Sequence, residues 1–406
     1  MNKFYKLVTI LSLFILSNNC IYSQWNMSVN LNGGQVNHLL NTGQYIFAAA
    51  SANGIYRSDD NGATWIQKNS GLENFLLVQT MSAWNNYVYA GTSGGGFFYS
   101  TNFGDLWIQS NQGLGQLNIK ALMSDSTGVY AGLIFAGIYR STNSGLNWSR
   151  FALGEGDLLY SFSFRSVNFY IGLEGGIYRS TNSGVNWAGF ISGLTNLSVR
   201  SVIQSDDKAY CGTSGGGVYY SDFGGSQWHP MNSGLPDPEV RNLYLFGTNL
   251  FAAIEGKGVY FYNQTAESWT GINQGLTDTN ISAMAVKDNY IYAGSSAGKI
   301  WKRPLSEIIT GINQNVSVVN EFRLYQNFPN PFNPVTGISF YIPERNFVTL
   351  KVIDITGREV SEIHSGVLPE GKHIKFWNGE NHSSGIYYYT LQSGSFSQTR
   401  KLVLIK

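Results

Sequence analysis

The sequence predicts an all-β protein in which a seven-bladed β-propeller is followed by a small Ig-like β-sandwich. Two observations carry this prediction: a tryptophan-centred pattern that recurs about every 41 residues, and a C-terminal stretch of strand-like segments outside that register. The composition agrees, since 15% aromatic residues and 47 glycines among 406 residues suit short strands joined by tight turns. Only 13% of the residues are charged, which argues against a disordered chain.

The repeated pattern is G-I-Y-R-S-x-x-x-G-x-x-W. Its full and weaker copies are residues 54–65, 96–107, 137–148, 176–187, 217–228 and 258–269. Successive tryptophans of these copies lie 39 to 42 residues apart. Trp25 lies one such step before the first copy, and Trp301 lies one step after the aromatic Tyr260 of the last. A register held this regularly indicates tandem copies of one structural unit.

Each unit contains four short, alternating segments bounded by Gly, Asn or Asp turns, as residues 197–232 illustrate. Four strands per unit, repeated in tandem, are typical of propeller blades. The segments add up to seven sets of first, second and third strands and seven fourth strands, and the series begins with a fourth strand. We therefore expect the Trp25 strand to pair with residues 298–303, which closes the ring and removes two unpaired sheet edges.

The turn between the third and fourth strands carries the motif Ser-x-Asp/Asn-x-Gly-x-x-Trp, which is complete at Ser58, Asp60, Gly62 and Trp65. It resembles the Asp-box (BNR) repeat of sialidases, sortilin-type receptors, xyloglucanases and photosystem II stability-factor propellers. We interpret it as structural: Asp or Asn accepts backbone N–H groups, Gly takes a positive φ, and Trp fills the gap between strands. The same roles are expected of Asn102, Trp107, Asn143, Trp148, Asn182 and Trp187. An acidic catalytic or metal site is the weaker alternative, because the boxes occur one per blade and most lack Asp.

The resemblance does not extend to the catalytic parts of those enzymes. Sialidases need an arginine triad and a Tyr/Glu pair, and xyloglucanases place paired acids between two propellers, whereas this chain has one propeller with short loops. The propeller contains only His38 and His229, and the G-x-S-x-G segments 91–95 and 212–216 are tight turns not followed by a helix. We expect no catalytic residue, no metal and no cofactor.

A binding site is expected where the first strands of the blades line the central channel. The residue after the first apolar position of each of these strands is Asn37, Gln79, Lys120, Ser161, Arg200, Arg241 or Ser282. We hypothesise that Arg200 and Arg241, with Lys120, bind a carboxylate, a sulfate or a polar glycan. Glu174 and Glu255 lie in nearby loops and join this candidate site. The alternative is that these positions are polar only because the mouth of the channel is exposed to solvent.

Residues 1–23 predict a secretory signal, because a basic start precedes an apolar run of ten residues, 7–16, which is too short to span a bilayer. Cleavage is expected between Ser23 and Gln24. Cys20 raises the alternative of a lipoprotein, but Ser17–Asn19 before it fit a lipobox poorly.

The signal contains Lys3 and Lys6 and no acidic residue, so the chain without it has 24 basic and 25 acidic residues. This balance argues against a nucleic-acid or anionic-membrane partner recognised by bulk charge. Cys211 is then the only cysteine, so no intramolecular disulfide is expected. No later apolar stretch is long enough for a transmembrane helix.

The last 85 or so residues leave the repeat register. Their strand candidates are 340–342, 349–354, 373–377, 386–391 and 401–405. The segments YQNFPNPFNP (325–334), DITGREV (354–360), SGIYYYTL (384–391) and TRKLVLIK (399–406) resemble the type IX secretion C-terminal sorting domain, type A. The resemblance implies Sec export through the periplasm and passage across the outer membrane, recognised by the type IX machinery through the folded tail. It also implies that the tail is usually cleaved and that the cargo is released or attached to surface lipopolysaccharide. An ordinary Ig-like accessory domain is the alternative.

The predicted organisation is therefore a signal peptide (1–23), a propeller (24–305), a linker (306–322) and a sorting domain (323–406). The favoured function is an exported surface or secreted protein that binds an extracellular glycan or protein. A glycoside hydrolase or lyase acting on extracellular polysaccharide, and a structural or adhesive surface protein, are the alternatives.

Overall fold

The structure is a computed structural model that describes residues 24–309 except 33, 154, 155, 166, 206 and 223, and residues 322–405 except 326, 328, 329, 331, 370 and 395. The chain divides into two compact units, Met1–Thr310 and Gly311–Lys406. The expected signal peptide, Ser23 included, and most of the expected linker lie outside the described residues. Within the described ranges no helix is long and apolar enough to cross a membrane.

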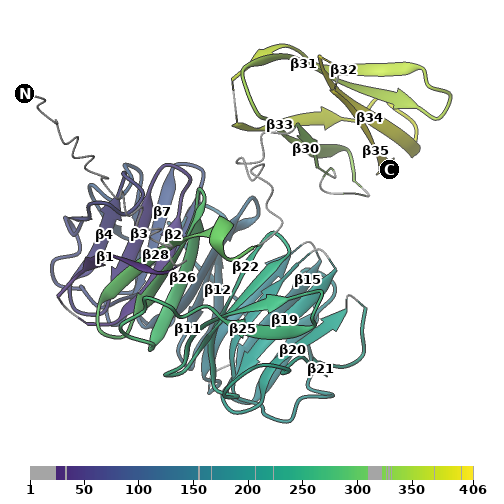
Figure 1. Cartoon of the computed structure of the whole chain (residues 1–406). Helices are drawn as coiled ribbons and strands as arrows, with labels where there is room; N and C mark the ends of the chain where they lie inside the picture. The colour runs from purple at the N-terminus through teal and green to yellow at the C-terminus, as the bar shows by residue number, and fades with distance from the viewer. Residues whose placement is uncertain are drawn as a thin grey trace, which may run out of the picture. The chain divides into compact units, whose positions relative to one another are not determined.

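The described part of the first unit forms seven four-stranded antiparallel sheets (Figure 1). Six of them follow the chain in order: β2 (Val36–Asn41), β3 (Ile46–Ala50), β4 (Gly54–Ser58), β5 (Ile66–Gln67); β6 (Val78–Trp84), β7 (Tyr87–Thr92), β8 (Phe97–Ser100), β9 (Ile108–Gln109); β10 (Ile119–Asp125), β11 (Gly128–Leu133), β12 (Gly137–Ser141), β13 (Ser149–Ala152); β14 (Leu159–Arg165), β15 (Asn168–Leu173), β16 (Gly176–Ser180), β17 (Ala188–Gly189); β18 (Val199–Gln204), β19 (Lys208–Thr213), β20 (Gly217–Asp222), β21 (His229–Pro230); β22 (Val240–Phe246), β23 (Asn249–Ile254), β24 (Gly258–Asn263), β25 (Ser268–Gly271).

The seventh sheet joins the two ends of the unit. It consists of β26 (Ile281–Lys287), β27 (Tyr290–Ser295), β28 (Lys299–Pro304) and, from the other end, β1 (Asn26–Asn30). Met27 lies opposite Trp301 in this sheet. The first strands of successive sheets lie next to one another, and β26 lies beside β2. The expected pairing of the Trp25 strand with the last strand is therefore present, and it closes a ring of sheets.

Tryptophan indoles link five of the sheets to the preceding one through hydrogen bonds to a backbone carbonyl. Trp107 Nε1 donates to the Lys68 carbonyl at 2.9 Å, and Trp25 Nε1 donates to the Ile272 carbonyl at 2.6 Å. The same inter-sheet bond is made by Trp148, Trp228 and Trp269. These five side chains are at most 6% exposed. Trp25 thus occupies the position that its register predicts and links the start of β1 to the preceding sheet, β22–β25.

The box turns are held together by local hydrogen bonds. Ser58 Oγ accepts the Gly62 N–H at 2.8 Å, and Asp60 Oδ1 accepts the N–H groups of Ala63 and Thr64 at 2.9 and 2.8 Å. The asparagines of three other copies, Asn102, Asn143 and Asn182, accept the equivalent N–H four residues on. Gly62 has a φ of 75°, which favours glycine. Hydrogen bonds, chiefly from Thr64, lower the pKa of Asp60 to about 2. These contacts support the structural interpretation of the box.

We expect Asp60→Ala to lower the free energy of unfolding by about 0.5–2 kcal/mol, because two backbone N–H groups lose their acceptor. The folded pKa lies below the unfolded value, so this contribution is present above about pH 4 and is lost as the pH falls through about 2. Urea unfolding at neutral and acidic pH measures both effects. Asp59→Ala, at the exposed neighbouring position, serves as the control and should change little.

A second repeated element follows the fourth strand in four of the sheets and was not anticipated from the sequence. Asn69 Oδ1 accepts the Ile55 N–H and Asn69 Nδ2 donates to the Asn53 carbonyl, both at 2.8 Å. A Cβ on Gly71, whose φ is 90°, would lie 2.0 Å from the Trp107 carbonyl oxygen, so only glycine fits there. Equivalent asparagines are Asn111, Asn232 and Asn273.

The second unit consists of two sheets around one core. The first contains β29 (Arg323–Leu324), β30 (Val335–Ile342) and β33 (Gly371–Asn378). The second contains, in spatial order, β32 (Glu359–Leu368), β31 (Asn346–Asp354), β34 (Gly385–Ser393) and β35 (Phe396–Leu404). Both contribute to the buried cluster, for example through Phe340 and Leu350. The five expected strands are present, but β32 was missed because this edge strand buries none of its side chains fully.

The expected linker start at residue 306 was placed too early. β28 continues to Pro304 and leads into a 3-10 helix, η1 (Leu305–Glu307), in which Leu305 is buried. Glu307 forms an ion pair with Arg303, with 3.4 Å between Oε2 and Nε. These residues therefore belong to the first unit, although no turn or repeat signal marks them.

Candidate functional site

The first strands of the sheets surround a cavity of about 390 Å³, which we call the funnel. The structure brings together all seven expected channel positions on its wall: Asn37, Gln79, Lys120, Ser161, Arg200, Arg241 and Ser282. This follows from the repeated register, because the second residue of each first strand occupies the same place in every sheet.

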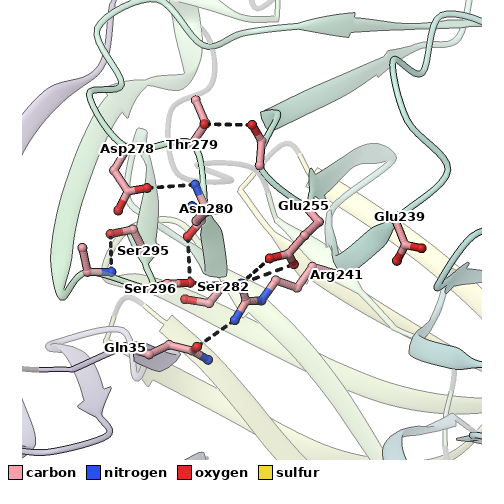
Figure 2. Close-up of polar contacts among 12 residues, drawn as sticks. Gln35, Glu239, Arg241, Glu255, Asp278, Thr279, Asn280, Ser282, Ser295 and Ser296 are labelled. Carbon is pink, nitrogen blue, oxygen red and sulfur yellow. Dashed lines mark hydrogen bonds and ion pairs between the residues drawn. The ribbon is translucent and has the colours of Figure 1, made fainter.

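Arg241 is held in the funnel wall by groups from three sheets (Figure 2). Its Nη1 lies 3.2 and 3.3 Å from the two Glu255 carboxylate oxygens and donates to Ser296 Oγ at 3.0 Å. Its Nη2 donates to Gln35 Oε1 at 2.7 Å. Arg241 is 24% exposed and Glu255 is 50% exposed, so the pair is accessible from the outside. The guanidinium is therefore positioned in advance, with its charge partly balanced.

Arg200 lies against an aromatic ring. Its guanidinium carbon is 4.3 Å from the centre of the Tyr160 ring. Tyr160 Oη and Ser198 Oγ both donate to Glu174 Oε2, at 2.6 and 2.9 Å. These two hydrogen bonds, followed by the charge of Arg200, lower the pKa of Glu174. The expected Glu174 lies beside the site, hydrogen-bonded to Tyr160 and Ser198, but it lines neither the funnel nor the outer cavity described below. Within the described residues Arg200 makes no side-chain hydrogen bond.

Lys120 adds a third cation to the same wall. Burial, and then the charges of Arg200 and Arg241, lower the pKa of Lys120. The three cations line the same cavity. His38 also lines the funnel, but burial lowers its pKa to about 4, so it is neutral at pH 7.

The two arginines also border an outer cavity of about 330 Å³, lined in addition by Ser214, Glu239 and Glu255. Ser214 Oγ donates to Glu239 Oε2 at 2.7 Å. Arg200 and Arg241 therefore lie where the funnel meets the outer surface of the loops. Neither this second hollow nor the roles of Gln35, Tyr160 and Ser296 were predicted, because they arise from side chains that meet across different sheets.

The second unit matches a family model. Residues 326–406 match the secretion system C-terminal sorting domain. No curated protein matches the chain.

Several solved structures share the fold. PorZ, an essential surface component of the type IX secretion system of Porphyromonas gingivalis, has a TM-score of 0.54 at 16% identity over 92% of this chain and 60% of its own. YCF48 from Cyanidioschyzon merolae has a TM-score of 0.58 at 10% identity, covering 70% of this chain and 99% of its own. The GH74 xyloglucanase from Xanthomonas campestris has a TM-score of 0.57 at 15% identity, covering 82% and 58%. The chain spans about 60% of the length of PorZ.

These likenesses support an all-β chain with a propeller-like first unit. The sorting domain indicates a protein exported by the type IX system through the periplasm to the cell surface or the medium. At identities of 10–16%, the solved structures inform the fold alone.

Proposed function

We propose that this protein is an exported binding protein whose funnel holds an anionic extracellular ligand. The first unit is a seven-bladed propeller of the Asp-box type, and the second is an Ig-like sorting domain read by the type IX machinery and later removed. The ligand class is a glycan, or a protein segment, that carries carboxylate or sulfate groups. The observation that carries the proposal is the convergence of Lys120, Arg200 and Arg241 on one cavity.

The charge arrangement favours an anion. Three cations face the funnel, while the two acidic groups of the site are already hydrogen-bonded, Glu255 to Arg241 and Glu174 to Tyr160. Hydrogen bonds from a guanidinium to carboxylate or sulfate are shorter and stronger than neutral ones. Arg241 is fixed in place before binding, which reduces the entropy that a ligand must overcome.

The test measures affinity for two probes, chondroitin sulfate and polygalacturonate oligosaccharides, by titration calorimetry on residues 24–406, the chain without the predicted signal but with its second unit. We expect Arg200→Gln/Arg241→Gln to weaken binding of the recognised probe by about tenfold or more. The control Arg345→Gln/Arg358→Gln removes the same charge from the second unit and should leave the affinity unchanged. Equal affinities of wild type and the funnel variant would place the site elsewhere.

The lowered pKa of Lys120 makes a pH prediction. As the pH rises through this pKa, Lys120 loses its charge before an ordinary lysine does, so anion affinity should fall in that interval. The unliganded chain should become more stable over the same interval, because the unfolded chain binds the proton more tightly than the folded one. Affinity and urea unfolding measured against pH check both signs. Lys120→Gln should remove both dependences; their persistence would assign them to another group.

The alternative enzyme function is less well supported. A glycoside hydrolase needs a carboxylic acid whose pKa is raised, so that it can donate a proton. The pKa of Glu174 is lowered instead, and Glu255 is paired with Arg241. Both acids therefore fit a role in positioning Tyr160 and Arg241.

A further inference from the structure

A separate cavity of about 520 Å³ lies between the β18–β21 sheet and the β22–β25 sheet. It shares no lining residue with the funnel. Its walls include Lys208, Tyr210, Tyr220, Asn232, Tyr262 and Gln264. Its volume lies in the range of small-molecule sites in proteins.

The cavity lies at a repeat that differs from three other repeats at one position of its third strand. The residue directly before the box serine, or its equivalent, is here called the spoke. In three sheets it is basic and donates to a backbone carbonyl of the next sheet: Arg57 to Phe103 at 2.6 Å, Arg179 to Gly225 at 2.8 Å and Lys302 to Asn61 at 2.9 Å. The spoke of the β18–β21 sheet is Tyr220. The spokes Tyr99 and Phe261 are not basic either, and Arg140 donates to the Thr127 carbonyl of its own sheet. Within the described residues Tyr220 donates to no carbonyl of the next sheet, and the space that a basic spoke bridges elsewhere is open.

The walls combine aromatic faces with polar groups. Tyr210, Tyr220 and Tyr262 supply three rings, and all three are only partly buried. Gln264 is fixed by its bond to the Thr248 carbonyl at 2.7 Å. Aromatic faces accept the C–H faces of a sugar ring, while amide and hydroxyl groups hydrogen-bond its hydroxyls.

The charges of this cavity differ from those of the funnel. Lys208 lies 4.6 Å from the Tyr220 ring centre and is ion-paired with Asp222, its Nζ 2.6 Å from Oδ1. The carboxylates of Asp207 and Glu267 also line the cavity and are exposed. The site therefore carries no excess of positive charge, and its acidic groups repel an anionic ligand.

We propose that this cavity is a second ligand site that binds a sugar unit of a neutral glycan, independently of the funnel. Tyr220 is the specificity-determining residue, because its ring replaces the basic spoke that spans the same gap in other sheets. The rings of Tyr210 and Tyr262 form the remaining aromatic wall.

In the test, three neutral probes, cellotetraose, mannotetraose and chitotetraose, are added to residues 24–406. Saturation-transfer NMR and calorimetry measure the binding. We expect wild type to bind at least one of them. Tyr220→Arg removes the ring, introduces a basic spoke that can span the gap as Arg57 does, and should weaken that binding by roughly tenfold or more. The matched control Tyr99→Arg makes the same change at the spoke of the β6–β9 sheet and should retain wild-type affinity.

Thermal unfolding monitors the fold of each variant, and Tyr220→Ala provides a second variant that removes the ring without adding charge. It too should lose about tenfold in affinity. Three results overturn the proposal: no binding of any probe by wild type, wild-type affinity in folded Tyr220→Arg or Tyr220→Ala, or loss of binding only in Arg200→Gln/Arg241→Gln. The last result would place the neutral glycan in the funnel.

Discussion

Deletion of residues 323–406 should leave the propeller in the periplasm, whereas the full chain reaches the cell surface or the medium. Residues 326–406 match the sorting domain, and its two sheets share one hydrophobic core, so the deletion removes a complete folded unit. The first unit keeps its own buried clusters and should remain folded. Cell fractionation and protease accessibility on intact cells measure the outcome.

A point variant tests whether export requires a correctly folded tail or only the presence of the tail. Tyr389 Oη donates to the Tyr325 carbonyl at 2.7 Å and accepts the Asn327 N–H at 2.8 Å, which anchors the segment that opens the sorting motif. Tyr389→Ala should reduce export, while Phe376→Ala, at an exposed site, should not. Surface display of the chain lacking 323–406 would refute the sorting role.

Trp25→Ala should lower the free energy of unfolding of the first unit by roughly 3–5 kcal/mol. The indole is only 2% exposed, and its N–H bond to the Ile272 carbonyl joins the first strand to the preceding sheet. Loss of the side chain opens a cavity at the join that closes the ring. Guanidinium unfolding followed by far-UV circular dichroism measures the change.

Trp187→Ala is the matched comparison. Trp187 is only partly buried, and its indole donates to the Gly184 carbonyl within its own turn, so it makes no such link between sheets. Trp187→Ala should therefore lower the free energy of unfolding by clearly less than Trp25→Ala does. Equal costs for Trp25→Ala and Trp187→Ala would show that the closing strand contributes no special stability.

The sequence predicted those features that depend on the repeat register. The pairing of the Trp25 strand with Trp301 and the seven funnel positions follow from counting, because equivalent residues of each unit occupy equivalent places. Arg200 and Arg241 were therefore placed in one cavity from their spacing alone. The repeat register does not indicate which ligand the cavity binds.

The features that the sequence did not predict depend on contacts between units. Tyr160 supports Arg200 from the adjoining sheet, and Ser296 reaches Arg241 from the closing sheet. The cavity at Tyr220 lies where the spoke does not bridge two sheets, and this position becomes informative only once Arg57 is seen to bridge them. Strand β32 was missed because an exposed edge strand has no buried face to impose alternation.

The most direct measurement joins the two ends of the first unit chemically. Asn26 and Lys302 are opposite each other in the closing sheet, and Cys211 is buried, so Asn26→Cys/Lys302→Cys presents two accessible thiols. A short bifunctional maleimide should cross-link them rapidly within one chain, seen as a mobility shift on a denaturing gel. The control Asn26→Cys/Arg140→Cys, with the second thiol on another sheet, should not react in this way. A closed ring predicts efficient intramolecular linkage of the first pair alone; failure of that pair, or equal linkage of the control, would contradict it.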